Sequence, residues 1–254
     1  MLKKLLKYDL KNSYKVVVIF YILAVAGAAI SRLMSLSDSV IIGDILKGFF
    51  AGFAISMSFS ILINSLMNSW VYFIRNVYGD ESYLTHTLPV GKNKIYMSKV
   101  LSTIIMMLTS VVVILITVAI AFYSKYNIGQ LKNMLLFTAE IFDSTMINLI
   151  LVFFVVFFLE MVFLYLSGLA GIIIAHKFNN HKTFKSFIFG FVIYTIFILF
   201  MLLVFAFTGY LQLSTFNVEQ IKSILGIGIV LYSISSIGAY IIGNYAFNKG
   251  VDVI

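Results

Sequence analysis

The chain contains no cysteine and a single proline, Pro89, among its 254 residues. The lack of cysteine excludes disulfide bonds and cysteine-ligated metal sites, and the single proline excludes proline-rich linkers. Charged residues make up only 11% of the chain, whereas soluble proteins carry ~25%. The sequence is therefore poor in the residues that form linkers, redox sites and water-facing surfaces.

Apolar side chains are correspondingly abundant, at 61% of the chain with a mean hydropathy of +1.05. Soluble domains contain ~45–50% apolar residues, and one soluble core buries only ~70% of the surface of its chain. Disordered chains are excluded as well, because they have low hydrophobicity. These exclusions leave an integral membrane protein.

Six apolar segments are long enough to cross a bilayer, for which a helix needs ~20 residues. They span approximately Val16–Met34, Leu46–Ile74, Val100–Tyr123, Met146–Ala175, Phe187–Tyr210 and Ile224–Phe247. The intervening segments are too short for a separate soluble domain. We therefore expect an all-α, polytopic membrane protein with six transmembrane helices, in which residues 1–254 form a single transmembrane domain.

Lysine and arginine gather on the cytoplasmic side of membrane proteins. With the N-terminus inside, thirteen basic residues fall on the inner side: Lys3, Lys4, Lys7, Lys11, Lys15, Arg75, Lys92, Lys94, Lys99, Lys177, Lys182, Lys185 and Lys249. Five fall in outer segments or at outer span ends: Arg32, Lys47, Lys125, Lys132 and Lys222. This bias predicts that both termini are cytoplasmic.

A cleavable signal peptide ending near Ala24-Val25-Ala26 is the competing interpretation of the start. We favour a retained span, because the apolar run continues past this point.

Motifs for common enzyme chemistry are missing from the sequence. It has no G-x-x-x-x-G-K-[ST] phosphate-binding loop and no H-E-x-x-H motif. His86, His176 and His181 fall in inner loops, and we interpret them as solvated loop residues rather than metal ligands. We therefore predict no catalytic residue, bound cofactor or metal in this chain and no nucleic-acid partner. Any ATP that drives it would bind to another chain.

The N-terminal residues Met1–Lys15 have an amphipathic pattern. Leu2, Leu5, Leu6 and Leu10 share one arc of a helical wheel, and the opposite arc holds Lys3, Lys4, Lys7, Lys11 and Lys15. We predict an interfacial helix on the inner leaflet, with Lys4, Lys7, Lys11 and Lys15 toward anionic lipid. Asp9 falls within the apolar arc and weakens the pattern. The alternative is ordinary positive-inside charge without a helix.

Two polar features lie within the predicted spans. In the second span Ser56, Ser60, Asn64 and Asn68 recur every four residues, and Ser58, Ser65 and Ser69 form a second row. Such rows either pack helices together or line a polar path for a substrate, and we favour packing.

Glu160 lies in the middle of the fourth span, where an ionised carboxylate costs ~2.5–3.5 kcal/mol unless it faces protein or water. It is either a proton-coupling or substrate-contact group or part of an interhelical hydrogen bond.

The inner loop Arg75–Lys99 contains a short predicted helix at residues 79–89. Asp80 would cap this helix, Glu81 would lie in its first turn, and Pro89 would end it. Leu84 and Leu88, four residues apart, would then share a face beside Tyr83. We favour burial of this face by a partner subunit. The alternative is a solvated loop whose leucines fold back on the ends of the spans.

These features together resemble a known family. The six spans, the basic amphipathic start and the sequence Tyr78-Gly79-Asp80-Glu81-Ser82-Tyr83-Leu84-Thr85-His86-Thr87-Leu88-Pro89-Val90 before the third span are similar to type-2 ABC transporter permeases of Gram-positive bacteria. Within that family the chain most resembles exporters of phenol-soluble modulins, lantibiotics and similar peptides. The resemblance covers the whole chain through its topology, and its most specific part is the loop.

The resemblance implies a permease subunit in the bacterial plasma membrane that exports amphipathic peptides or other hydrophobic compounds. Two copies of a separate ABC ATPase subunit would bind ATP and magnesium, and a second permease subunit, here a second copy of this chain, would complete the transporter. Residues 1–15 would be the elbow helix. Asp80, Glu81, Tyr83, Leu84 and Leu88 would form the coupling helix that docks on the ATPase. The alternative function is a proton-coupled secondary transporter that uses Glu160, although broken-helix signals for such a transporter are missing.

The charge bias leads to a test of the topology. A reporter fused at Tyr126, between the third and fourth spans, should give an extracellular signal, because thirteen of the basic residues then remain on the inner side. Paired phosphatase and fluorescent-protein fusions would measure this. A cytoplasmic signal at Tyr126 would contradict the assignment of the spans.

Overall fold

The computed structural model describes residues 2–35, 42–122, 125–178, 180–210 and 217–250. These residues form eight helices and no strand. The helices are α1 (Leu2–Met34), α2 (Ile42–Val77), α3 (Ser82–His86), α4 (Lys92–Phe122), α5 (Lys125–Ile141), α6 (Met146–Ala175), α7 (Lys182–Phe207) and α8 (Val218–Asn248). Among the described residues, six helices are long and apolar enough to span a membrane: α1, α2, α4, α6, α7 and α8. The all-α, multi-pass membrane fold expected from the sequence is confirmed.

The helices extend beyond the apolar segments predicted from the sequence. The largest difference is at the start, where α1 runs without a break from Leu2 to Met34. A separate elbow helix at residues 1–15 was therefore a wrong prediction, although the helical conformation of Leu2–Lys15 was right. The reason is local, because this stretch contains neither glycine nor proline, the two residues that end helices most readily. The predicted ends at Met1 and Tyr123 lie outside the described residues.

Helix α5 was missed by the sequence analysis, which treated this region as an outer connection. Its apolar residues Leu131, Met134 and Phe137 are all exposed in the structure. They recur every three residues, which is a weak helical signal that could have identified the element. With 17 residues, the helix is too short to count as a candidate membrane span.

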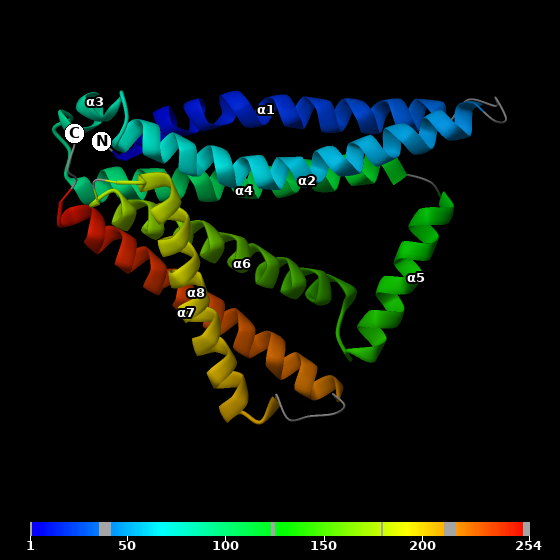
Figure 1. Ribbon diagram of the computed structural model, residues 1–254. Coiled ribbons are helices and arrows are strands. Elements are labelled where there is room, and N and C mark those ends of the chain that lie inside the picture. Colours follow the sequence, from blue (N-terminus) through cyan, green and yellow to red (C-terminus); the bar gives the residue numbers. More distant parts are fainter. Residues whose placement is uncertain (1, 36–41, 123–124, 179, 211–216, 251–254) are drawn as a thin grey trace. The chain divides into compact units, whose positions relative to one another are not determined.

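The chain forms two compact units, Met1–Gln130 and Leu131–Ile254, and each is described by itself. In the first unit α1 runs alongside both α2 and α4, which also contact each other (Figure 1). Hydroxyl groups connect these helices: Ser65 bonds to Ser110 at 2.7 Å, Tyr21 bonds to the same Ser110 at 2.7 Å, and Tyr14 bonds to Thr109 at 2.6 Å. Hydrogen bonds of this kind hold membrane helices together where water offers no competition.

The second unit is organised around α6, which packs along both α7 and α8. Phe163 of α6 is fully buried, and its ring lies 5.1 Å from that of Tyr194, 5.7 Å from Phe197 and 6.2 Å from Tyr232. Nearer the end of α6, Gly171 faces Gly190 of α7 so closely that a Cβ on Gly171 would lie 2.5 Å from the Gly190 Cα. Small residues allow this close backbone approach between α6 and α7.

This close approach leads to a stability prediction. Gly171→Ala should destabilise the protein by about 1–3 kcal/mol, because the new methyl group meets backbone atoms that cannot turn aside. Gly228→Ala in α8 is the matched control, since no atom lies within 4 Å of its Cβ position. Thermal unfolding in detergent would measure both. A melting temperature for Gly171→Ala equal to that of the control would contradict the packing.

Candidate functional site

The loop between α2 and α4 contains α3, which is shorter than predicted and begins differently. The helix spans Ser82–His86, and Glu81 occupies the N-cap position without a side-chain cap bond. The predictions that Asp80 caps this helix and that it continues to Leu88 were therefore wrong. The Thr87 N–H bonds to the Tyr83 carbonyl and closes the helix before the chain reaches the proline.

Polar side chains hold α3 against the end of α2. Glu81 accepts a hydrogen bond from the Asn76 amide at 2.8 Å and forms an ion pair with Arg75 at 3.2 Å. Thr85 donates to the Asn76 Oδ1 at 3.1 Å, and the His86 Nε2 lies 3.2 Å from the Val77 carbonyl oxygen. The carboxylate of Glu81 is thus used between elements, which explains why it does not cap its own helix. The sequence analysis missed the roles of Asn76 and Thr85, because a partner nine residues away across a turn leaves no periodic pattern.

The apolar side chains of this loop face outward. Tyr83 is 75% exposed, Leu84 68% and Leu88 41%. The alternative in which the leucines fold back on the span ends is therefore wrong for Leu84. Exposed apolar side chains beside a firmly anchored polar face are typical of a surface that another protein covers.

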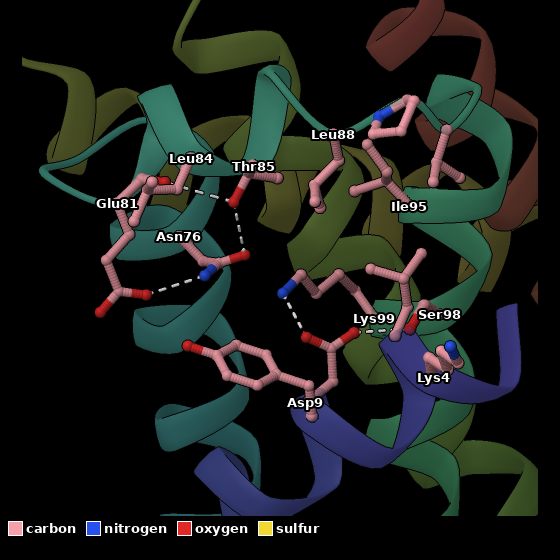
Figure 2. Close-up of a pocket in the computed structure, with 14 residues that line it drawn as sticks. Lys4, Asp9, Asn76, Glu81, Leu84, Thr85, Leu88, Ile95, Ser98 and Lys99 are labelled. Carbon is pink, nitrogen blue, oxygen red and sulfur yellow. Dashed lines mark hydrogen bonds and ion pairs between the residues drawn. The ribbon is translucent and has the colours of Figure 1, made fainter. Parts of the chain in front are cut away.

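A cavity of about 620 Å³ lies between this loop and the adjoining ends of α1, α2 and α4. Figure 2 shows the residues around it, which come from all of these elements. The lining residues are Lys4, Leu5, Tyr8, Asp9, Asn76, Glu81, Leu84, Thr85, Leu88, Pro89, Val90, Ile95, Ser98 and Lys99. Ligand sites in proteins typically have volumes of ~300–1,000 Å³ and mostly apolar walls with a few placed polar groups. The cavity fits that description.

A buried ion pair lies at the base of this cavity. The Lys99 ammonium donates to the Asp9 carboxylate at 2.5 Å, and these residues are only 5% and 2% exposed. Ser98 donates to the second Asp9 oxygen at 2.5 Å, and the Tyr72 hydroxyl donates to the first at 2.9 Å. The pair thus connects α1, α2 and α4. From the sequence alone, Asp9 only weakened an amphipathic pattern, and Lys99 was one of the inner basic residues, at the end of the loop before the third span. An acidic residue within an apolar arc was the signal that could have revealed the pair.

The other predicted membrane-surface and path residues are distributed as follows. Lys4, Lys7, Lys11 and Lys15 are all exposed along α1.

The second polar row of α2 is buried; it consists of Ser58, Ser65 and Ser69. In the first row Ser56 is exposed and Ser60, Asn64 and Asn68 are half-buried. Asn68 donates to the Ser13 carbonyl of α1 at 2.9 Å, so this position packs helices. Whether the remainder of the first row lines a path stays a prediction.

Glu160 lies in the second unit and is half-buried. Its carboxylate is within electrostatic range of the hydroxyls of Tyr194 in α7 and Tyr232 in α8. Tyr194 and Tyr232 are therefore neighbours of Glu160 within its own unit. Its role in transport or in packing stays a prediction.

His176 is not a solvated loop residue, contrary to the interpretation of the sequence. It follows the last residue of α6, is buried, and its Nδ1 lies 2.8 Å from the Ile172 carbonyl oxygen. Burial lowers the pKa of His176 below its usual value, because the protonated ring would be poorly solvated there. His181, by contrast, is exposed in a left-handed turn before α7. The two histidines therefore have different surroundings.

Comparison of the chain with protein-family models, with curated proteins and with solved structures gave no match.

The buried ion pair leads to a prediction about stability. Lys99→Met should cost about 3–5 kcal/mol, because the Asp9 carboxylate would remain buried without its cation. The double variant Asp9→Asn/Lys99→Met should regain most of this loss, since no buried charge remains, and the amide oxygen can accept from Ser98 while the amide N–H donates to the Tyr72 hydroxyl. Unfolding of the purified variants in detergent would measure the difference.

The matched control for this prediction is Lys92→Met, which removes an exposed lysine from the start of the same helix. A Lys99→Met variant that is as stable as Lys92→Met would show that the pair contributes little to the fold.

Proposed function

We propose that this chain is the membrane-spanning permease subunit of an ATP-driven exporter of the type-2 ABC class. The observation that carries the proposal is the arrangement of α3, which is anchored to α2 by its polar side chains and presents Tyr83 and Leu84 outward. A separate ATPase subunit covers these two side chains. The six apolar helices support a transporter in general, because they provide the membrane-spanning body that such a subunit needs.

The contacts of α3 provide a route for mechanical coupling. A force applied to Tyr83 or Leu84 passes through Glu81 and Thr85 to Asn76, near the last residue of α2. On its other side the loop leads into α4 at Lys92. Movement of the ATPase after ATP binding would thus reach two spanning helices directly. A loop held only by exposed backbone would instead absorb such a movement.

The remaining parts of the proposal concern substrate and assembly. ATP and magnesium bind to the ATPase subunit, of which two copies act on two permease subunits. The substrate is an amphipathic peptide or another hydrophobic compound that moves out of a bacterial cell across the plasma membrane. These statements follow the resemblance of the loop and the topology to peptide exporters.

Charged substitutions at the exposed face of α3 test the proposal. The double variant Tyr83→Glu/Leu84→Glu should bind the proposed ATPase subunit at least about a hundredfold more weakly, because burial of each apolar side chain contributes ~1.5–3 kcal/mol. The membrane helices should still fold, since both side chains are exposed and make none of the anchoring contacts. Co-purification and ATP hydrolysis in liposomes would measure the effect.

The matched control is Leu131→Glu/Met134→Glu in α5, which also charges two exposed apolar side chains of a helix but lies in the predicted outer segment. It should leave ATPase binding unchanged. If wild-type chain and ATPase do not associate, or if the α3 variant binds and exports like the wild type, the proposed function is wrong.

A further inference from the structure

The cavity beneath α3 lies at the depth of lipid headgroups. From Asp9 to Arg32, α1 rises ~35 Å at ~1.5 Å per residue, and α4 rises the same distance from Lys99 to Phe122. The hydrocarbon core of a bilayer is ~30 Å thick. The Asp9–Lys99 pair therefore lies near one edge of this core, from which the exposed Lys11 and Lys15 of α1 reach back to the headgroups along their apolar stems. The cavity residues Lys4, Leu5 and Tyr8 precede Asp9 in α1, so they lie at headgroup level.

The charges around the cavity favour an anion. Lys4 lines it, and the other exposed lysines on the adjoining helix ends are Lys3, Lys7, Lys92 and Lys94. The two carboxylates that line it are already engaged, Asp9 by Lys99, Ser98 and Tyr72, and Glu81 by Arg75 and Asn76. Asp80 adds one exposed carboxylate on the loop. Lysines thus outnumber the unpaired acids at this end of the unit.

Lys99 supplies a donor at the base of the cavity. An ammonium group has three N–H bonds. One is directed to Asp9 at 2.5 Å and one to the Tyr72 hydroxyl at 3.3 Å. Figure 2 shows the ammonium pointing into the space between Asn76 and Leu88. Its third N–H can therefore bond to an acceptor oxygen in the cavity.

The walls of the cavity suit an apolar group next to this anion. Leu5, Tyr8, Leu88, Val90 and Ile95 line it. A free phosphate ion would leave these walls exposed to water, whereas a lipid would cover them with its glycerol region and upper acyl chains. Basic pockets between membrane helices on the cytoplasmic side bind anionic lipid headgroups in other proteins.

We propose that this cavity binds an anionic phospholipid of the surrounding leaflet. The headgroup lies at the lysine rim formed around Lys4, the third N–H of Lys99 bonds to a phosphate or ester oxygen, and the apolar walls contact the glycerol region. The site is a property of the isolated chain and does not depend on an ATPase. Of the two side chains proposed to contact the ATPase, Leu84 also lines this cavity, whereas Tyr83 does not.

Lipid titration of the purified, delipidated chain tests this site. Native mass spectrometry should show saturable binding of one dioleoylphosphatidylglycerol and at least about fivefold weaker binding of dioleoylphosphatidylcholine. Lys4→Gln should weaken phosphatidylglycerol binding about fivefold, since one lysine near an anionic headgroup is lost. Lys15→Gln is the matched control, because it removes an exposed lysine of α1 that does not line the cavity.

A second pair of variants tests the cavity itself. Leu5→Trp fills the cavity and should weaken phosphatidylglycerol binding roughly tenfold. Leu23→Trp places the same ring on an exposed position of α1 outside the cavity and should have no effect. An excess of inorganic phosphate should not displace the lipid, because phosphate alone leaves the apolar walls uncovered.

Several results would overturn the lipid site. These are unsaturable binding, equal binding of the two lipids by the wild type, equal effects of Lys4→Gln and Lys15→Gln, or displacement by inorganic phosphate. Because these measurements use the chain without ATPase, their failure leaves the proposed function standing. Failure of ATPase binding likewise leaves the lipid site standing.

Discussion

The ion pair between Asp9 and Lys99 fixes the first unit of this protein at the end where its candidate site lies. Removing two charges from water is unfavourable by several kcal/mol per ion, and their attraction offsets this only when the remaining hydrogen-bonding capacity is filled. Here Ser98 and Tyr72 complete the coordination of the carboxylate. Three helices must therefore meet in one register. The floor of the cavity and the position of the α3 loop above it both follow from that register.

Elsewhere the two units use different means to hold apolar helices together. In the first unit, hydroxyl groups of serine, threonine and tyrosine bond across α1, α2 and α4. In the second, aromatic rings surround Phe163, and Gly171 and Gly190 allow the backbones of α6 and α7 to meet. Both solutions reflect the same constraint. In a bilayer, helix association depends on close packing and hydrogen bonding, because lipid tails are as apolar as the side chains they would replace.

The loop around α3 combines a polar and an apolar side with different tasks. The polar side fixes α3 to α2 through Asn76, so its position is determined by this chain alone. The apolar side chains remain exposed, which leaves them for contacts that the chain does not itself provide. The proposed ATPase contact and the proposed lipid site are neighbouring surfaces of this loop that share Leu84, which lines the cavity and is exposed. Tyr83 does not line the cavity and belongs to the proposed ATPase contact alone.

Composition and apolar run length by themselves determined the membrane location and the six spanning helices, because no soluble core can bury so many apolar side chains. The basic residues also predicted an orientation, and the exposed apolar loop between the second and third spans was visible as a motif. The boundaries of the helices were harder to predict from the sequence. Nothing in a hydropathy pattern separates an interfacial helix from the start of a span, so the continuity of α1 through Lys15 emerged only in the structure.

Only the tertiary structure decided which polar residues act together. Asp9 and Lys99 lie ninety positions apart, and Asn76 reaches Glu81 and Thr85 across a turn. His176 was equally ambiguous, since a histidine just past a span can be solvated or buried depending on the helices beside it. Sequence spacing reports contacts along one helix, through its 3.6-residue period. Contacts between helices depend on their register and crossing, which packing sets, and for this reason the candidate site became visible only after the helices were placed.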